Sequence, residues 1–246
     1  MYHIICGVVM NLIRKYVDKK LDRPNRPRFM SAFFCGIIFC MTVVASVAVS
    51  TLAQGLLSKI LLSAVFPIGL FIIVANEYDL FTSTVMNLKK LTIKNQRGYA
   101  AVSTLVIYLG NFLGAVLCAY AMHALGVIEK LHLAEAFQSL HNTKTALAYH
   151  NIFFLGIFCN FLICMSVYLS LKGENFVEKC AYMFIPVFLF VLLGFEHSIA
   201  NMAYFSIAVF SSNQPVMPAV VNVLFATLGN LVGGLLFVVS VRAKSK

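Results

Sequence analysis

Six long apolar runs constrain this chain more than any other feature of its sequence. Each run is long enough for the roughly 20 helical residues that a hydrocarbon core requires. Hydrophobic residues make up 61% of the chain and charged residues 11%, against about 45–50% and about 25% in soluble domains. A soluble enzyme, a disordered chain and a secreted disulfide scaffold are therefore poor interpretations. We expect an all-α integral membrane fold with six transmembrane helices, at approximately 29–53, 60–88, 99–125, 151–171, 177–210 and 216–241.

The basic residues predict an orientation in the membrane. Sixteen of the nineteen Lys and Arg residues lie in the N-terminal segment, the loops after the second and fourth runs, and the C-terminal tail. Lys59, Lys130 and Lys144 lie on the other side. Because cytoplasmic loops carry an excess of Lys and Arg, both termini are expected in the cytoplasm of a multi-pass protein of the cell inner (plasma) membrane. The net charge of +10 is then an orientation signal, and no nucleic-acid interface is expected.

The apolar runs also divide the chain into regions. Residues 1–28 are expected to form an amphipathic helix on the cytoplasmic membrane surface, because charge interrupts them too soon for a span. Residues 29–241 form the transmembrane domain, and 242–246 a cytoplasmic tail. The seven cysteines contain no CxxC and are expected to pack as small apolar residues. Four histidines recur every nine residues around the outer loop, where a solvated loop is favoured over a metal site: His123, His132, His141 and His150.

An internal repeat appears when the chain is shifted on itself by 119 positions. Gly110-Asn111 and Gly114 fall on Gly229-Asn230 and Gly233. Pro67 also falls on Pro186, and Ile38-Phe39-Cys40 falls on Ile157-Phe158-Cys159. Each half, about 29–125 and 148–241, holds three spans, so the second half must cross the bilayer upside down. Inverted repeats of this kind are typical of transporters, in which broken helices meet near the midplane.

Polar residues within the second and fifth runs mark the expected helix breaks, at 76–85 and 194–202. Ionisable side chains at membrane depth are costly, which makes Glu77, Asp79, Glu196 and His197 functional candidates. Half-helices that begin after such breaks direct their N–H groups toward the centre, which suits an anion. The alternative for the acidic residues is that they only hydrogen-bond the broken helices together.

The same residues resemble the formate/nitrite transporter family. Asp79-Leu80-Phe81-Thr82 is similar to the family's acid-Leu-Phe-Thr segment, and the run from Phe195 to Met202 to its second signature. The Asn-containing motif around Asn160 and the Gly110-Asn111 motif are similar to those of the fourth and third spans. The resemblance extends from about 30 to 241. It departs from the family at Asp79, where the family usually has Glu, and at 76–78, where Asn-Glu-Tyr replaces the usual glycine-rich lead-in.

This resemblance implies an aquaporin-like fold with helices 2 and 5 broken, assembled as a homopentamer in membrane lipid with one pore per subunit. By motif, it implies a substrate and proton site whose members are Thr82, His197, Lys144, Asn160, Glu196 and Asn201. It also implies apolar constrictions on either side of that site, formed by Phe66, Leu70, Leu80, Phe81 and Phe190. No cofactor, metal site or enzymatic activity is expected.

A mechanism follows from comparing two free energies. Moving a bare anion through a water-free constriction of phenylalanine side chains costs several kcal/mol of hydration free energy, even after relaxation. Protonating a carboxylate of pKa about 4 at pH 7 costs about 4 kcal/mol. Crossing as the neutral acid is therefore competitive. We expect Lys144 to attract the anion, Thr82 to orient it and His197 to lend a proton. Formate is the favoured substrate, nitrite is a second candidate, and hydrosulfide is the alternative.

Overall fold

The structure of the chain is a computed structural model that describes residues 25–86 and 97–243. The surface helix expected over 1–28 lies almost entirely outside these residues. In the described part of the chain all regular structure is helical. The helices are α2 (Asn25–Ser50), α3 (Gly55–Val65), α4 (Pro67–Ala75), α5 (Phe81–Thr84), α6 (Arg97–Ala124), α7 (Val127–Lys130), α8 (Ala134–Thr145), α9 (Tyr149–Ser170), α10 (Phe176–Leu192), α11 (Ser198–Ser212) and α12 (Val216–Ala243).

Five helical segments within the described residues are long and apolar enough to cross a membrane. Four correspond to single helices (α2, α6, α9 and α12), and the fifth, Gly55–Ala75, joins α3 and α4. They match five of the six expected spans. The remaining one, 177–210, is divided between α10 and α11, which have 17 and 15 residues.

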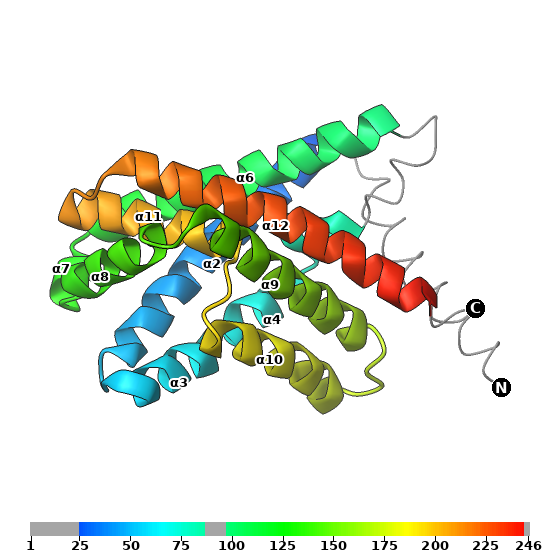
Figure 1. Cartoon of the computed structure of the whole chain (residues 1–246), viewed down its shortest axis with the longest axis horizontal. Coiled ribbons are helices and arrows are strands. Elements are labelled where there is room, and N and C mark those ends of the chain that lie inside the picture. The colour runs from blue at the N-terminus through cyan, green and yellow to red at the C-terminus, as the bar shows by residue number, and fades with distance from the viewer. Residues whose placement is uncertain (1–24, 87–96, 244–246) are drawn as a thin grey trace.

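Two pairs of long helices form the frame of the molecule. Helix α2 packs along α6, and α9 packs along α12, as Figure 1 shows for the second pair. Glycine makes both approaches possible, because a Cβ added at Gly114 would collide with the carbonyl oxygen of Phe33, and one at Gly233 with that of Ile157. Small residues at such contacts let transmembrane helices meet at backbone distance.

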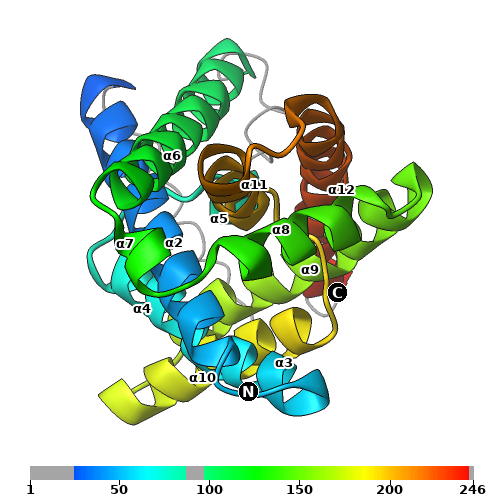
Figure 2. The same cartoon turned by 90° about the vertical axis from the view of Figure 1, so that its left-hand side faces the viewer.

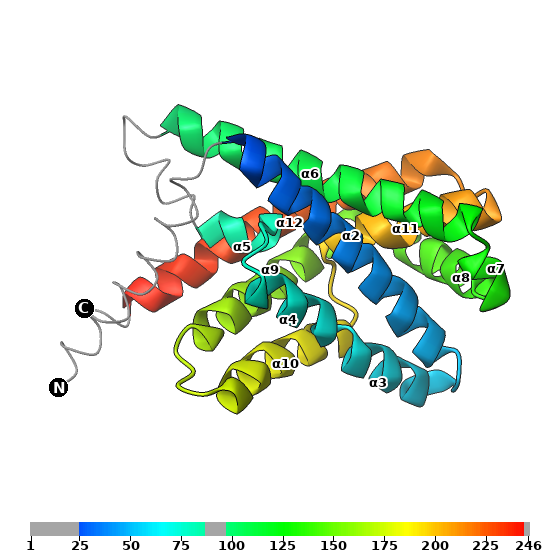
Figure 3. The same ribbon diagram turned by 180° about the vertical axis from the view of Figure 1, so that it is seen from behind.

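Two of the shorter helices, α5 and α11, are enclosed by the others. Figure 2 shows α5 and α11 in the middle of the molecule, surrounded by the longer helices. In Figure 3, α3, α4 and α5 follow one another across the molecule. Phe66 ends α3, and α4 begins at Pro67, because proline lacks an N–H and is tolerated in the first turn of a helix.

Helices α4 and α10 end in the same hydrogen-bond pattern. Tyr78 N–H donates to the carbonyl of Ile73 at 2.9 Å, and Phe195 N–H to that of Phe190 at 3.0 Å. The residue before each donor has a positive φ, 55° at Glu77 and 70° at Gly194. A left-handed residue just after a helix is a common C-terminal cap, and glycine adopts it without strain. Glu77 is thus held where the other half of the chain has glycine.

The contacts also show how the two halves correspond. Gly110 and Gly229, 119 residues apart, approach the carbonyl oxygens of Phe29 and Phe153, which are 124 apart. The matching helix ends at 78 and 195 are 117 apart. The offset of 119 therefore applies to α6 and α12 only, and the sequence match of Ile38-Phe39-Cys40 to Ile157-Phe158-Cys159 is not a structural equivalence. Insertions between elements change the offset from helix to helix.

Candidate functional site

Thr82 and His197 meet at the centre of the molecule, from opposite halves of the chain. Thr82 is the second residue of α5, and His197 is the residue before α11. Thr82 Oγ1 lies 3.1 Å from His197 Nε2, and both side chains are buried. The chain is extended before each helix, at Leu80 and at His197, so each helix N-terminus begins beside this pair.

The hydrogen bonds of the imidazole define its tautomer. Ala200 N–H donates to His197 Nδ1 at 3.0 Å, so Nδ1 caps α11 as an acceptor. A neutral imidazole carries its one proton on the nitrogen that does not accept. His197 Nε2–H therefore donates to Thr82 Oγ1, and the Thr82 hydroxyl proton is directed to another acceptor. A second proton on the ring would have to bind Nδ1, which would break the hydrogen bond from Ala200 N–H.

Two aromatic rings are stacked on this imidazole. The Phe190 ring is stacked on it with centroids 6.0 Å apart, and the Phe39 ring is stacked on it at 5.1 Å. Phe66 packs in an edge-to-face arrangement with Phe39 and with Phe190, with ring centroids 5.9 Å apart in each case. Of the expected constriction residues, Phe190 thus lies against His197, and Phe66 packs on Phe190 and on Phe39, a residue that was not expected at the site.

The other expected constriction residues are all buried but differ in their contacts. Leu80, Leu70 and Phe81 are at most 3% exposed. Leu80 immediately precedes α5, whereas the ring of Phe81 packs on Tyr108 of α6 with centroids 4.8 Å apart. The Tyr108 hydroxyl lies 3.1 Å from Thr227 Oγ1 of α12. Phe81 thus contacts the residue that links the two long helices.

Lys144 forms an ion pair, which bears on its expected role in attracting the anion. Its ammonium donates to Glu196 Oε1 at 2.8 Å, and the two side chains are 14% and 1% exposed. Asn201 Nδ2 donates to the other oxygen of Glu196 and to Asn222 Oδ1, and Asn222 Nδ2 donates to the carbonyl of Lys144. This closed network joins α8, α11 and α12. Lys144 and Glu196 together carry no net charge, so long-range attraction of an anion by Lys144 is weakened.

The three asparagines of the expected motifs support the backbone around this site. Asn160 Nδ2 donates to the carbonyl of Asn230 at 2.6 Å, so Asn160 binds the backbone of α12. Asn111 and Asn230 hold the first residues of α5 and α11. Asn111 Oδ1 accepts from Phe81 N–H, and Asn230 Oδ1 accepts from Ser198 N–H, both at 2.9 Å.

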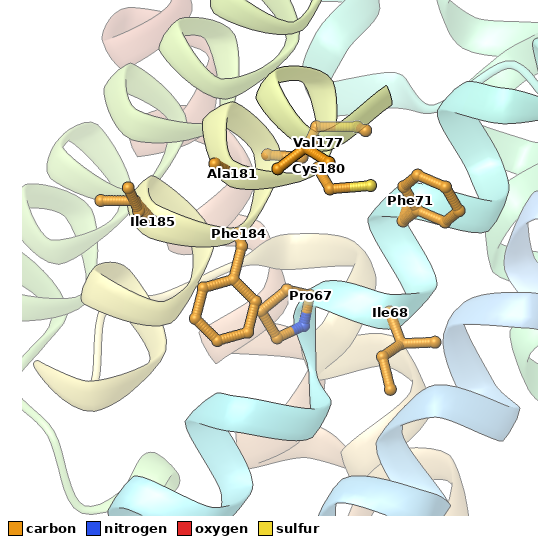
Figure 4. Close-up of a pocket in the computed structure, with 9 residues that line it drawn as sticks. Pro67, Ile68, Phe71, Val177, Cys180, Ala181, Phe184 and Ile185 are labelled. Carbon is orange, nitrogen blue, oxygen red and sulfur yellow. The ribbon is translucent and has the colours of Figure 1, made fainter. Parts of the chain in front are cut away.

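Two other features lie apart from the central pair. An apolar groove between α4 and α10 is lined by residues such as Pro67, Phe71 and Phe184, and by none of the expected site residues (Figure 4). The histidines that recur every nine residues differ in their surroundings. His123 pairs with Glu129, whereas His141 is buried against Phe205. In 25–86 and 97–243, no three His, Cys, Asp or Glu side chains are grouped to hold a metal ion.

Comparison with known proteins identifies the family. The model of the formate/nitrite transporter family matches residues 8–243. The chain belongs to this family. It is similar to a probable formate transporter of Methanothermobacter thermautotrophicus, with 32% identity over 71% of this chain and 70% of that protein. It is also similar to the formate channel FocA of Haemophilus influenzae, with 32% identity over 69% of this chain and 68% of the relative.

Solved structures of the family have the same fold. An FNT family ion channel superposes with a TM-score of 0.82 and 23% identity, covering 93% of this chain and 96% of that one. A pentameric formate channel with formate bound superposes with a TM-score of 0.79 and 26% identity, covering 88% and 95%. This member of the formate/nitrite transporter family is therefore an all-helical, multi-pass membrane protein whose relatives are channels and transporters.

Proposed function

We propose that this chain transports formate, together with a proton, through a pathway in each protomer of a homopentamer. The observation that carries the proposal is the buried Thr82–His197 hydrogen bond, enclosed by Phe66 and Phe190. Relatives named as formate channels and a pentameric formate channel of the same fold support it. They favour formate over hydrosulfide, and the family description keeps nitrite as a second substrate.

The transmembrane arrangement that we propose has six spans in two inverted halves. The second span comprises α3, α4 and α5, and the fifth comprises α10 and α11, each interrupted by an extended segment. The surplus of Lys and Arg near the termini supports a cytoplasmic location for both ends in the plasma membrane. In this orientation α8 and Lys144 face the outside.

An anion entering from outside first meets Lys144. An ammonium has three N–H donors, so pairing with Glu196 leaves donors for a carboxylate. Because the pair is neutral, this contact selects a small anion by short hydrogen bonds rather than by a long-range field. Glu196 and Asn201 hold the ammonium in place for that contact.

At the centre, the Thr82 hydroxyl donates to the carboxylate. His197 Nε2–H donates a hydrogen bond to Thr82 Oγ1, so the Thr82 hydroxyl proton points toward the substrate. A carboxylate must lose its charge to pass the phenylalanine rings without a large desolvation penalty. His197 can lend a proton only if it gains a second one at Nδ1, which requires release of the Ala200 N–H bond. We therefore propose that the transported proton arrives with the anion, while His197 stays neutral and orients Thr82.

Proteoliposomes test this proposal. We expect formate uptake by wild-type protein to acidify the lumen with one proton per formate, and a Thr82→Val variant to lose most of both fluxes. Competition by nitrite and hydrosulfide ranks the substrates. Formate uptake without a proton contradicts the coupling, preferred uptake of hydrosulfide contradicts the substrate assignment, and wild-type flux in Thr82→Val contradicts the site.

A further inference from the structure

Phe39 contacts the central site from a helix that carries none of the other site residues. It lies in the middle of α2 and is 2% exposed. Its ring is nearly parallel to the imidazole of His197, with an interplanar angle of 16° and a centroid separation of 5.1 Å. Stacked rings at this separation are in favourable contact. Phe39 and Phe190 are therefore both in stacking contact with His197.

The helix that carries Phe39 is held firmly. One turn before it, Gly36 faces the backbone of α6 so closely that an added Cβ would collide with the carbonyl oxygen of Asn111. A small shift of α2 toward α6 is therefore excluded by backbone contact. The Phe39 ring is thus delivered to His197 by a rigid element, as precise sites require.

Phe39 also closes the set of rings around the site. Phe66 contacts Phe39 with an interplanar angle of 61° and Phe190 with an angle of 86°. The three rings come from α2, the junction of α3 and α4, and α10. Replacing any one of these rings by a smaller side chain would widen the space beside His197 and Thr82, next to the helix that carries the ring.

We propose that Phe39 is a positioning and specificity-determining residue of the transport site. Its ring holds the plane of the His197 imidazole, so that Nε2–H reaches Thr82, and it limits the size of the acid that can pass. The role rests on the proposed function, because it concerns the same pathway. It adds a third aromatic side to a constriction that would otherwise be formed by Phe66 and Phe190.

The relative flux of acetate and formate tests this role, because the two acids differ by one methyl group. A difference of one methylene in an apolar pocket is worth roughly 10-fold or more in discrimination. In proteoliposomes we expect the acetate-to-formate ratio to rise roughly 10-fold in Phe39→Leu, and the formate flux to fall as Thr82 loses its orientation. Phe39→Tyr retains the ring and should retain the wild-type ratio. Phe34→Leu, at an exposed position of the same helix, is the matched control.

The outcomes separate this inference from the proposed function. A wild-type protein that carries no formate contradicts the proposed function. Wild-type formate flux with an unchanged acetate-to-formate ratio in Phe39→Leu contradicts only the role of Phe39. If Phe39→Leu does not assemble, Phe39→Met is used for the same measurement of the acetate-to-formate ratio. Failure of both variants to assemble, with Phe39→Tyr intact, would show that the ring is needed for packing alone and would overturn the assignment.

Discussion

Asn111 and Asn230 make the same three hydrogen bonds in the two halves of the chain. Each side-chain oxygen accepts an N–H at the start of a short helix, from Phe81 or Ser198. The Asn111 amide group donates to the carbonyls of Ala32 and Asp79. The Asn230 amide group donates to those of Gly156 and Glu196. The two asparagines thus replace the backbone hydrogen bonds that are lost where α5 and α11 begin.

Removing either asparagine should destabilise the protein by a similar amount. Asn111→Ala and Asn230→Ala each remove three buried hydrogen bonds, and the N–H group at the start of α5 or α11 then loses its partner, at a cost of about 1–3 kcal/mol. We expect a clear and comparable fall in Tm for the detergent-solubilised protein, measured by thermal unfolding. Asn142→Ala, at an exposed position of α8, is the control. A large fall in only one variant would contradict the equivalence of the two halves.

The two ring nitrogens of His197 can be tested separately. Asparagine can supply an oxygen near the position of Nδ1, and glutamine an N–H near that of Nε2. His197→Asn should keep the cap of α11 and the wild-type Tm but lose formate flux. His197→Gln should retain part of the flux and lose about 1 kcal/mol of stability with the cap. The reverse assignment of flux and Tm would show that Nδ1, rather than Nε2, serves transport.

The Lys144–Glu196 pair predicts a non-additive pair of substitutions. Lys144→Met leaves the buried carboxylate of Glu196 without its counter-charge, which typically costs roughly 3 kcal/mol. We expect Tm to recover when Glu196→Gln is added, because no uncompensated charge then remains buried. Formate flux should stay low in the double variant, since the anion has lost its ammonium contact. Additive losses of Tm in the double-mutant cycle would mean that the two groups do not stabilise each other.

Because φ is positive at Gly194 but not at Gly98, replacement by alanine should have opposite effects on stability at these two glycines. Neither Gly194 nor Gly98 has an atom within 4 Å of an added Cβ, but only Gly194 has a left-handed backbone, with φ of 70°. Gly194→Ala should lower the stability by about 1 kcal/mol through backbone strain. Gly98→Ala, within α6, should raise it by about 0.5–1 kcal/mol. Equal Tm values for the two variants would exclude backbone strain as the cause.

Local sequence signals singled out the two residues that meet at the centre, but not the residues around them. Asn111, Asn230, Thr82 and His197 are polar residues in apolar runs, and such residues are conspicuous in any membrane segment. Phe39 could not be singled out in this way, because one phenylalanine in an apolar helix carries no signal of its own. The pairing of Lys144 with Glu196 joins residues 52 positions apart, which no local pattern indicates.

The internal repeat illustrates the same limit. Glycine and asparagine identify equivalent positions in α6 and α12 because their roles depend on backbone contact. The matched Pro67 and Pro186 behave differently, since Pro67 begins α4 whereas Pro186 lies inside α10. An ungapped comparison cannot follow insertions between helices, so only its strongest match corresponded to a shared geometry.

The glycine contacts within α2/α6 and α9/α12 limit how this protomer can move. Backbones that touch cannot slide past each other by fractions of an ångström, as helices separated by large side chains can. Each pair of helices therefore moves as one rigid body. Any rearrangement that admits a substrate then involves side-chain rotation and the non-helical segments 76–80 and 193–197. Opening and closing of the pathway should then take place without a change in the outer shape of the protomer.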